Sequence, residues 1–381
     1  MVITGIVVEY NPFHNGHIHH IKEARAKTNC DLLIAIMSPT FMQRGEPAVL
    51  NKYERAVAAV RNGVDLLIEL PSIYAINSAN YFAKGALSIL NECQIDYLVF
   101  GSENNDVDSL INAARVSTSN EYQLLLKDYV KKGIRYANAC NYAFNDLGID
   151  SVKESNDILA LAYIQEIVRN NYDIKPISIL RTNSFLSKKT TGNISSATAI
   201  RHHLHNNKTI EKYSSMSQVL ENNNELVNFN DYFYLLKYLV NTYSTSQLKE
   251  IYGFDEGLEF LFKKHINSTN NIFDYIDMLS SKRYPKTRIQ RNIIYLLLNH
   301  TKTEHLNIKV DYIRILAMNK FAQTYIKTLK KLTTYHVISN FSAIKSNSLD
   351  FEKRVTFVYS CAKQNLDYLN KKEYQSKTII V

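Results

Sequence analysis

The sequence predicts an α/β protein in which a parallel five-stranded sheet in the first half of the chain is followed by a helical second half. Over residues 1–201, short and almost wholly apolar segments alternate with helical patterns, as in a parallel sheet covered by helices on both faces. From residue 202 the alternation stops and helical periodicity continues. Charge divides at the same place: residues 1–201 hold 20 basic and 20 acidic side chains, so the net charge of +9 falls entirely in residues 202–381. We therefore expect two domains, 1–201 and 202–381.

The elements of the first domain follow from its apolar segments. Strands are expected over 2–8, 31–37, 64–70, 96–100 and 174–180. Helices are expected over 17–27, 53–62, 79–92 and 157–170, with polar helices and connections inserted over 104–150. Ligands of open parallel sheets bind at the carboxyl ends of the strands, near the point where the strand order reverses. We therefore expect a ligand site where the first and fourth strands end.

The second domain is expected to be mainly helical. Leu and Tyr recur at helical spacing over 232–243, 256–265, 272–280, 289–298 and 312–322. An Asn- and Ser-rich stretch over 206–230 indicates a loop, and residues 335–381 show no assignable pattern. A neutral domain joined to a basic one indicates a small-molecule site that works beside a polyanion.

Composition narrows the environment of the protein. No segment approaches the roughly 18–20 apolar residues that span a membrane, and the first residues lack the pattern of a secretion signal. The cysteines, Cys30, Cys93, Cys140 and Cys361, are scattered without a Cys-x-x-Cys pair, so neither disulfides nor a zinc ribbon is indicated. We expect a cytoplasmic protein with neither a membrane nor DNA as a partner.

A phosphate-binding pattern, Asn11-Pro12-Phe13-His14-Asn15-Gly16-His17, follows the first strand and opens the first helix. The amides and dipole of a helix N-terminus favour phosphate oxygens, Gly16 allows close backbone approach, and His14 and His17 offer imidazole N–H donors. We expect the backbone alone to hold this turn. The alternative is a metal site formed by His14, His17, His19 and His20, but zinc hydrolases with two helical histidines place them four apart with a glutamate between.

A second phosphate-binding pattern, Ile194-Ser195-Ser196-Ala197-Thr198-Ala199-Ile200-Arg201, follows the last expected strand. Ser195 and Ser196 fall where a helix begins, and their hydroxyls and the free amides suit the outer phosphates of a nucleotide. Arg201 is placed to neutralise departing pyrophosphate. The catalytic residues predicted from the two patterns are His14, His17, Ser195, Ser196 and Arg201.

The two patterns resemble the HxGH and ISSTxxR elements of the HIGH-type nucleotidyltransferase superfamily, whose members attack the α-phosphate of ATP. Together with QRGEP (43–47), DLLIELP (65–71), FGSE (100–103) and SNDIL (155–159), in this order, the chain is similar to the bacterial tRNA(Met) cytidine acetate ligase family. The resemblance covers at least residues 2–201. It implies a Rossmann-like domain that activates acetate with ATP as acetyl-adenylate, releases pyrophosphate and forms N4-acetylcytidine at the wobble position of elongator tRNA(Met).

The resemblance also implies where ATP binds. Gly101 would leave space for the adenosine, Asn156 would bind ribose or base edges, and Arg181 follows the last strand on the ligand side. Mg²⁺ is expected to accompany ATP, without a dedicated protein metal site. The implied ATP-binding residues are Val7, Val8, Glu9, Tyr10, Asn11, Pro12, Phe13, His14, Asn15, Gly16, His17, Ile18, His19, His20, Gly101, Asn156 and Arg181.

The strongest basic segment surrounds Tyr284 and leads into an apolar helix. Its cations suit phosphate contacts beside an aromatic ring on which a base can stack. The alternative is a solvated helix face, because such charge runs are common on helices. The predicted tRNA-binding residues are Lys282, Arg283, Lys286, Arg288 and Arg291.

Two other functions remain open on the residues alone. An adenylyltransferase acting on a small phosphorylated metabolite would share the first domain but would not need a basic extension of 180 residues. A non-catalytic RNA-binding protein with a relic nucleotide fold would explain the charge and leave both phosphate patterns idle. ATP–pyrophosphate exchange with acetate, run with and without tRNA, separates the three functions.

Overall fold

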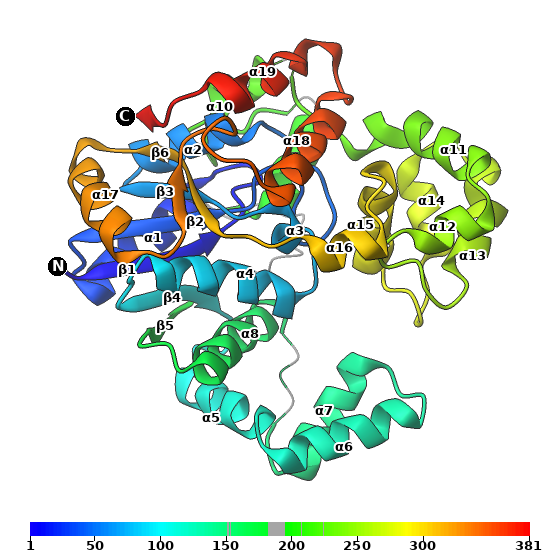
Figure 1. The fold of residues 1–381 in the computed structure, drawn as a ribbon, viewed down its shortest axis with the longest axis horizontal. Coiled ribbons are helices and arrows are strands. Elements are labelled where there is room, and N and C mark those ends of the chain that lie inside the picture. Colours follow the sequence, from blue (N-terminus) through cyan, green and yellow to red (C-terminus); the bar gives the residue numbers. More distant parts are fainter. Residues whose placement is uncertain (151, 153, 182–194, 207, 224) are drawn as a thin grey trace.

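The five expected strands are present in the computed structural model, which describes residues 1–381 except 151, 153, 182–194, 207 and 224. All five are parallel, in the order β5-β4-β1-β2-β3 (Figure 1). The chain places β2 on one side of β1 and β4 on the other, so the strand order reverses at β1. The bounds are β1 Ile3–Val8, β2 Leu32–Met37, β3 Leu66–Glu69, β4 Tyr97–Ser102 and β5 Lys175–Leu180.

Helices cover both faces of this sheet, because alternate strand residues point to opposite sides and nearly all are apolar. In β2, Leu33 and Ala35 pack toward α1 (Asn15–Thr28) and α2 (Lys52–Arg61). Leu32 and Ile34 pack on the other side with α4 (Ala79–Glu92), α5 (Val107–Ser117) and α8 (Ser155–Asn170). The short α3 (Ser72–Ala75) precedes α4, and α6 (Asn120–Lys131) and α7 (Tyr136–Asp146) complete the expected polar insertion.

The helical part of the second half lies beside the carboxyl ends of the strands (Figure 1). The four expected helices that begin near 232, 256, 272 and 289 are confirmed. Helices α9 (Ala197–His205) and α10 (Ser217–Glu221) lead into this part from the sheet. Its elements are η1 Phe229–Tyr232, α11 Phe233–Thr242, α12 Thr245–Glu250, α13 Leu258–His265, η2 Ile266–Ser268, α14 Ile272–Leu279, α15 Lys286–Leu297 and α16 Lys302–Asn307.

The helix expected over 312–322 is wrong. Residues Tyr312–Met318 form β6, which pairs antiparallel with β3 and extends the sheet. From Tyr312 to Ala317 every residue is buried and all but Arg314 are apolar, and periodicity cannot distinguish such a short, mostly apolar run from a buried helix. Apolar residues at the start of the next helix, α17 (Lys320–Leu332), prolonged the apparent helical pattern.

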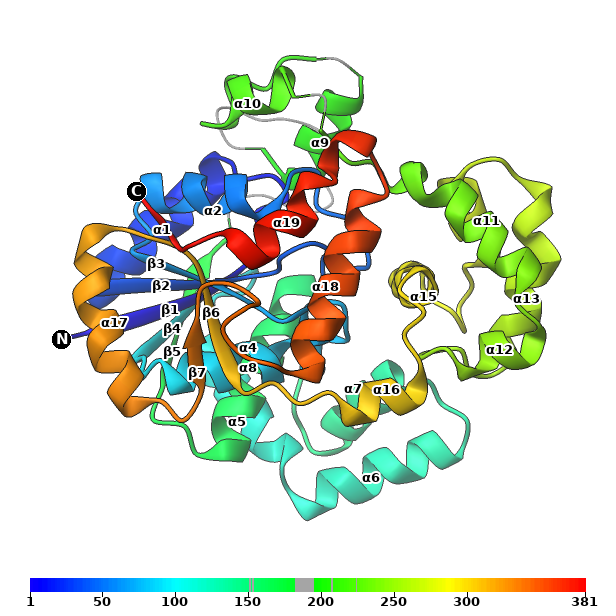
Figure 2. The same cartoon turned by 45° about the horizontal axis from the view of Figure 1, so that its top comes forward.

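The last residues of the chain return to the sheet as well, so the second half is not helical throughout. β7 (His336–Ile338) and β8 (Ile379–Ile380) both pair parallel with β6. Between them lie α18 (Asn347–Ser360), η3 (Gln364–Leu366) and α19 (Tyr368–Gln375). Figure 2 shows α18 and α19 lying near α2 and the sheet. Across the described residues, no helix combines the length and the hydropathy that a membrane crossing requires.

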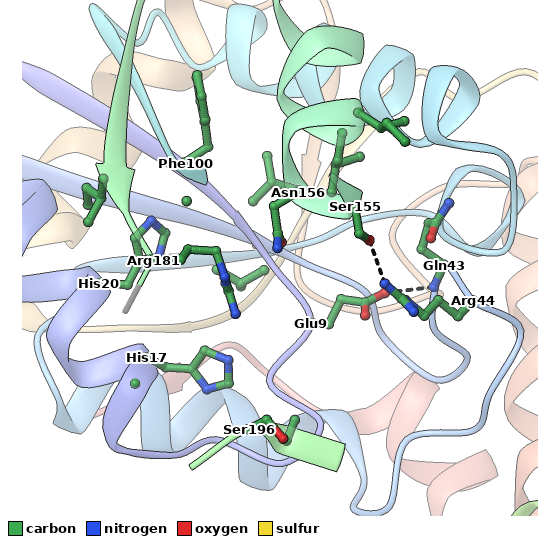
Figure 3. A pocket seen from close by; sticks show the side chains of 18 of the residues that line it. Glu9, His17, His20, Gln43, Arg44, Phe100, Ser155, Asn156, Arg181 and Ser196 are labelled. Atoms are coloured by element: carbon green, nitrogen blue, oxygen red, sulfur yellow. Dashed lines mark hydrogen bonds between the residues drawn. The ribbon is translucent and has the colours of Figure 1, made fainter. Parts of the chain in front are cut away.

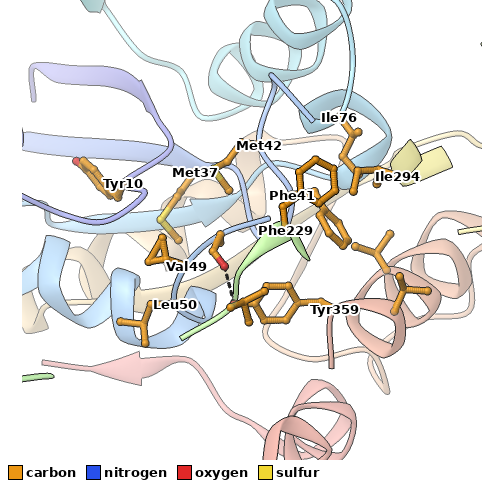
Figure 4. Packing of buried hydrophobic residues seen from close by; sticks show 14 of the residues in the cluster. Tyr10, Met37, Phe41, Met42, Val49, Leu50, Ile76, Phe229, Ile294 and Tyr359 are labelled. Atoms are coloured by element: carbon orange, nitrogen blue, oxygen red, sulfur yellow. Dashed lines mark hydrogen bonds between the residues drawn. The ribbon is translucent and has the colours of Figure 1, made fainter. Parts of the chain in front are cut away.

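A shared core joins the helical part and the C-terminal helices to the sheet. Phe229 and Ile294 from the helical part pack in one cluster with Phe41 from the loop after β2 and Tyr359 from α18 (Figure 4). The Tyr359 hydroxyl also donates a hydrogen bond to the carbonyl of Ala48 (2.9 Å). Burial of these large side chains stabilises the position of the helical part relative to the ends of the strands.

A buried ion cluster fixes β6 against the parallel strands and α19. Arg314 lies 3.0 Å from the Glu69 carboxylate and 2.5 Å from that of Glu373. Lys52 of α2 lies 2.9 and 2.7 Å from the same two carboxylates. Burial acts to raise the pKa of Glu373, but Arg314 and Lys52 outweigh it and hold that pKa down at about 2.

Removing one cation from this cluster is expected to destabilise the fold strongly. Arg314→Met should lower the free energy of unfolding by about 3–5 kcal/mol, because it leaves two buried carboxylates to share the single cation of Lys52. Lys132→Met is the matched control, because Lys132 pairs with Asp128 at the surface and such pairs contribute less than about 1 kcal/mol. Urea unfolding monitored by circular dichroism measures both, and equal losses would contradict the role given to the cluster.

Candidate active site

A cavity of about 520 Å³ opens at the carboxyl ends of β1, β4 and β5. The starts of α1, α8 and α9 border it, so the positive ends of three helix dipoles lie around the space. Phe82, Phe100 and Tyr163 give it apolar walls, and Figure 3 shows polar side chains from several elements around the same space. The cavity therefore lies where the strand order reverses, as expected from the sequence.

The imidazoles of His14 and His17 hold the turn at the start of α1. The Nδ1 atom of His14 accepts a hydrogen bond from the amide of Gly16 (3.0 Å), and Nδ1 of His17 accepts one from the amide of His14 (3.1 Å). This reciprocal pair caps the helix. The expectation that the backbone alone holds the turn is therefore wrong, because two of its amides are satisfied by side chains.

These hydrogen bonds also settle which ring nitrogen carries the proton. With Nδ1 accepting in both rings, a neutral imidazole keeps its proton on Nε2. Burial, aided by Arg181 and Arg201, lowers the pKa of His14 to about 3, and burial with His14 nearby lowers the pKa of His17 well below its ordinary value. Both residues line the cavity as neutral Nε2–H donors stacked 3.7 Å apart.

The other two histidines of the cluster differ in exposure. Both line the cavity, but His19 is exposed and His20 is half-buried. Burial and the nearby Arg181 lower the pKa of His20 to about 4. Within the described part of the chain, no group of three or more His, Cys, Asp or Glu side chains is arranged to hold a metal ion.

Gly101 and Arg181 lie together at the ends of β4 and β5. A Cβ atom on Gly101 would come 3.2 Å from both Cγ and Cδ of Arg181. The missing side chain therefore makes room for Arg181, and Gly101 also lines the cavity, so its expected role toward the adenosine stays a prediction. Arg181 itself lines the cavity.

Asn156 lies at the start of α8 and points into the cavity (Figure 3). Its side-chain amide donates to Glu103, and the same carboxylate accepts the backbone amides of Asn156 and Asp157 (both 3.1 Å). In return, the Asp157 carboxylate accepts from Ser102 Oγ (2.5 Å) and the Glu103 amide (3.1 Å). Two carboxylates thus fix the start of α8 against the end of β4.

The second predicted pattern reaches the cavity through its serines. Ile194 lies outside the described residues. Ser196 caps α9 by accepting from the amide of Ala199 (3.1 Å), and both Ser195 and Ser196 line the cavity. Ser195 Oγ is buried and has no hydrogen-bond partner among the described residues.

Arg201 is not among the described residues that line the cavity. Its guanidinium donates to the carbonyl of Asn11 (2.8 Å) and to the Glu46 carboxylate (2.9 Å). Gln290 of α15 donates to the same carboxylate (3.3 Å). Arg201 therefore connects α9 with the first phosphate-binding loop, and through Glu46 with the helical part.

The predicted tRNA-binding cations divide into two places. Arg291 and Thr287 of α15 line the cavity, and Arg291 donates to the carbonyl of Gln43 (3.2 Å). Lys282 and Lys286 are exposed, and Lys286 pairs with Asp277 (2.6 Å). Arg283 and Arg288 flank the Tyr284 ring and both pair with Glu256.

Several lining residues escaped the sequence analysis as site residues. Gln43 and Arg44 belong to the QRGEP segment, and Arg44 donates to Ser155 Oγ at the start of α8 (2.7 Å). The sequence analysis recognised the QRGEP segment, but only the fold shows that its first two residues lie at the cavity. Ala79 and Thr287 gave no signal in the sequence.

Because His14 caps α1, replacing it with Asn and replacing it with Ala should have different effects on the stability of the fold. Asn places a side-chain oxygen close to the position of Nδ1 and is a favoured cap, so His14→Asn should fold with nearly unchanged stability. His14→Ala should lose about 1 kcal/mol of unfolding free energy by comparison. Thermal unfolding of the two variants measures the difference, and equal stability would show that the imidazole does not support the turn.

Comparison with known proteins agrees with this geometry. The family model described as HIGH Nucleotidyl Transferase matches residues 1–374. The tRNA(Met) cytidine acetate ligase of Anoxybacillus flavithermus is 36% identical over 378 residues, covering 94% of each chain. That of Bacillus subtilis is 34% identical over 384 residues, covering 94% of this chain and 92% of the relative.

Two crystal structures of Thermotoga maritima TmcAL match the whole of this chain over their own full length, at 29% identity. The TM-score is 0.90 for the form bound with alpha-thio ATP and 0.93 for the apo form. This chain therefore belongs to the tRNA(Met) cytidine acetate ligase family of HIGH nucleotidyltransferases.

Proposed function

We propose that the chain activates acetate with ATP and transfers the acetyl group to N4 of the wobble cytidine of elongator tRNA(Met). The observation that carries this proposal is the pair of neutral Nε2–H donors, His14 and His17, at the mouth of α1. Such fixed donors stabilise charge that develops on a phosphate in the transition state. The names of the relatives and the ATP analogue bound to the Thermotoga maritima protein support the same reaction.

In the first step, a carboxylate oxygen of acetate attacks the α-phosphorus and the bond to pyrophosphate breaks. Acetate is ionised at neutral pH, so positioning and electrostatic stabilisation carry most of this step. His14 and His17 bind the α-phosphate, and Ser195 and Ser196 bind the outer phosphates at the start of α9. The buried Ser195 hydroxyl, unpartnered among the described residues, supports this role. Arg201 positions the loop through Asn11 and Glu46.

The remaining cavity groups suit the nucleotide. Arg181, beside His17 and His20 of α1, and Asn156, at the start of α8, line the cavity (Figure 3), and we assign them to ATP contacts. Mg²⁺ enters with the triphosphate, to which it would supply charge neutralisation. Arg44, Arg181 and Arg291 supply fixed positive charge around the cavity, which suits the phosphates and not a dedicated metal site, and His14 and His17 remain neutral.

In the second step, the cytidine N4 amine attacks the activated acetyl group. The base must arrive unstacked, as bases of anticodon loops do. The residues of α15 and those just before it support an approach of the base along this helix. Thr287 and Arg291 line the cavity, and Lys282 and Lys286, before and at the start of the helix, are exposed. We therefore propose that the unit 202–381 holds the tRNA.

Acetate-dependent ATP–pyrophosphate exchange tests this function. The chain should exchange with acetate in the absence of tRNA, and adding tRNA and ATP should yield N4-acetylcytidine, detected by mass spectrometry of digested RNA. His14→Asn and His17→Asn should each slow exchange by about 10²–10³-fold, because each removes one donor to the developing charge. Exchange with a phosphorylated metabolite instead of acetate would favour the adenylyltransferase alternative, and RNA binding without any exchange would favour the relic fold.

The exposed cations should contribute to tRNA affinity through counterion release. A variant with Ala at Lys282, Arg283, Lys286 and Arg288 should bind tRNA more weakly, and the salt slope of log affinity should flatten by about 0.7–0.9 for every phosphate that is no longer neutralised. The matched control places Ala at four exposed lysines of α17, Lys320, Lys327, Lys330 and Lys331. It removes the same charge at the end of the sheet opposite to α15 (Figure 1). Binding titrations at several salt concentrations that give both variants the same slope would place the tRNA elsewhere.

A further inference from the structure

Glu9 places a carboxylate in the cavity immediately after β1. Its side-chain Oε1 accepts a hydrogen bond from the amide of Gln43 (2.7 Å), and its backbone carbonyl accepts one from the buried Arg55 (2.7 Å). The residue is therefore fixed at both ends. Figure 3 shows its carboxylate beside Gln43 and Arg44, below Asn156. Among the described residues that line the cavity, Glu9 supplies the one carboxylate.

A carboxylate is an unfavourable group in a cavity that must accept both ATP and acetate. Its charge opposes both anions, and burial raises its pKa further than the Gln43 amide and Arg44 lower it. The charged and titratable groups that face it are Arg44 and Glu46 from the loop after β2, Arg55 from α2, Arg201 from α9 and Tyr163 from α8. The first step of the proposed reaction has no use for a base, so the second step must explain Glu9.

The second step needs a proton acceptor. When the N4 amine forms a bond to the acetyl carbon, the nitrogen becomes positively charged and must lose a proton. The imidazoles of His14 and His17 are poor acceptors, because their Nδ1 atoms already accept backbone amides and their Nε2 atoms carry protons. Arg44, Arg181 and Arg291 are cations, so they cannot accept a proton either. Of the other two histidines that line the cavity, His20 is a weak base because burial and Arg181 lower its pKa to about 4, and His19 is exposed to solvent.

We propose that Glu9 is the general base of acetyl transfer, an assignment that rests on the function proposed above. The N4 lone pair forms the N–C bond, and the bond between the acetyl carbon and the AMP oxygen breaks with its electron pair staying on AMP. The N4 proton passes to the free oxygen of the Glu9 carboxylate and then to water. A buried and fixed carboxylate of raised basicity suits that task.

Glu9→Gln isolates this step, because the Gln side-chain oxygen can still accept the Gln43 amide while the base is lost. Acetate-dependent exchange measures what the substitution costs ATP binding and activation, and acetyl-adenylate, captured by hydroxylamine as acetohydroxamate, should still form. Single-turnover transfer to tRNA should fall by about 10²–10⁴-fold, the usual contribution of a general base. Thermal unfolding checks that the variant is folded, and Glu9→Asp, which keeps a carboxylate, should recover part of the transfer rate.

The pH profile of transfer separates a base from a group that only positions the cytidine. In the wild type the transfer rate should rise with pH as Glu9 ionises and then level off, since the carboxylate acts only when deprotonated. Glu9→Gln should lack that rise. Three results would overturn the role of Glu9. They are transfer at the wild-type rate in Glu9→Gln, an equal loss of exchange and transfer, and slow transfer that keeps the wild-type pH profile. A wild type without acetate-dependent exchange would instead overturn the proposed function itself.

Discussion

The reciprocal hydrogen bonds between His14, Gly16 and His17 are the constraint on which the site depends. They cap α1, fix both rings and leave the proton of each neutral imidazole on Nε2. Burial keeps the rings neutral, so they add no charge to the cavity, and in the reaction proposed above they act on phosphate as fixed dipoles. One arrangement thus serves both the folding of the first turn and the chemistry proposed for it, which explains why removing an imidazole is expected to affect both.

The second half of the chain is connected to this turn through short polar links and a common core. Glu46 accepts from Arg201 and from Gln290, so one carboxylate joins α9, α15 and the loop after β2. Arg201 reaches the Asn11 carbonyl inside the phosphate-binding loop. The core around Phe41 and Tyr359 holds the helical part and α18 against the same loops (Figure 4). The surface proposed to hold the tRNA is thus joined to the cavity by groups already in contact.

The sequence predicted the first five strands because each is a short apolar run separated by helices, and it predicted both phosphate-binding patterns because they rest on local turn chemistry. It failed for β6, whose buried Arg314 and apolar neighbours read equally well as a helix. It also failed where a role depends on a rotamer or on tertiary contact. The caps formed by His14 and His17, the space that Gly101 leaves for Arg181, and the arrival of Arg291 at the cavity all depend on residues brought together by folding.

The central claim is that a carboxylate oxygen of acetate attacks the α-phosphorus of ATP in the cavity at the start of α1. Reaction with acetate labelled with ¹⁸O at both oxygens tests it most directly, by mass spectrometry of the AMP released after acetyl transfer. An adenylate intermediate leaves one acetate oxygen on AMP, so the account predicts singly labelled AMP and unlabelled pyrophosphate. Unlabelled AMP, or label in inorganic phosphate, would contradict it.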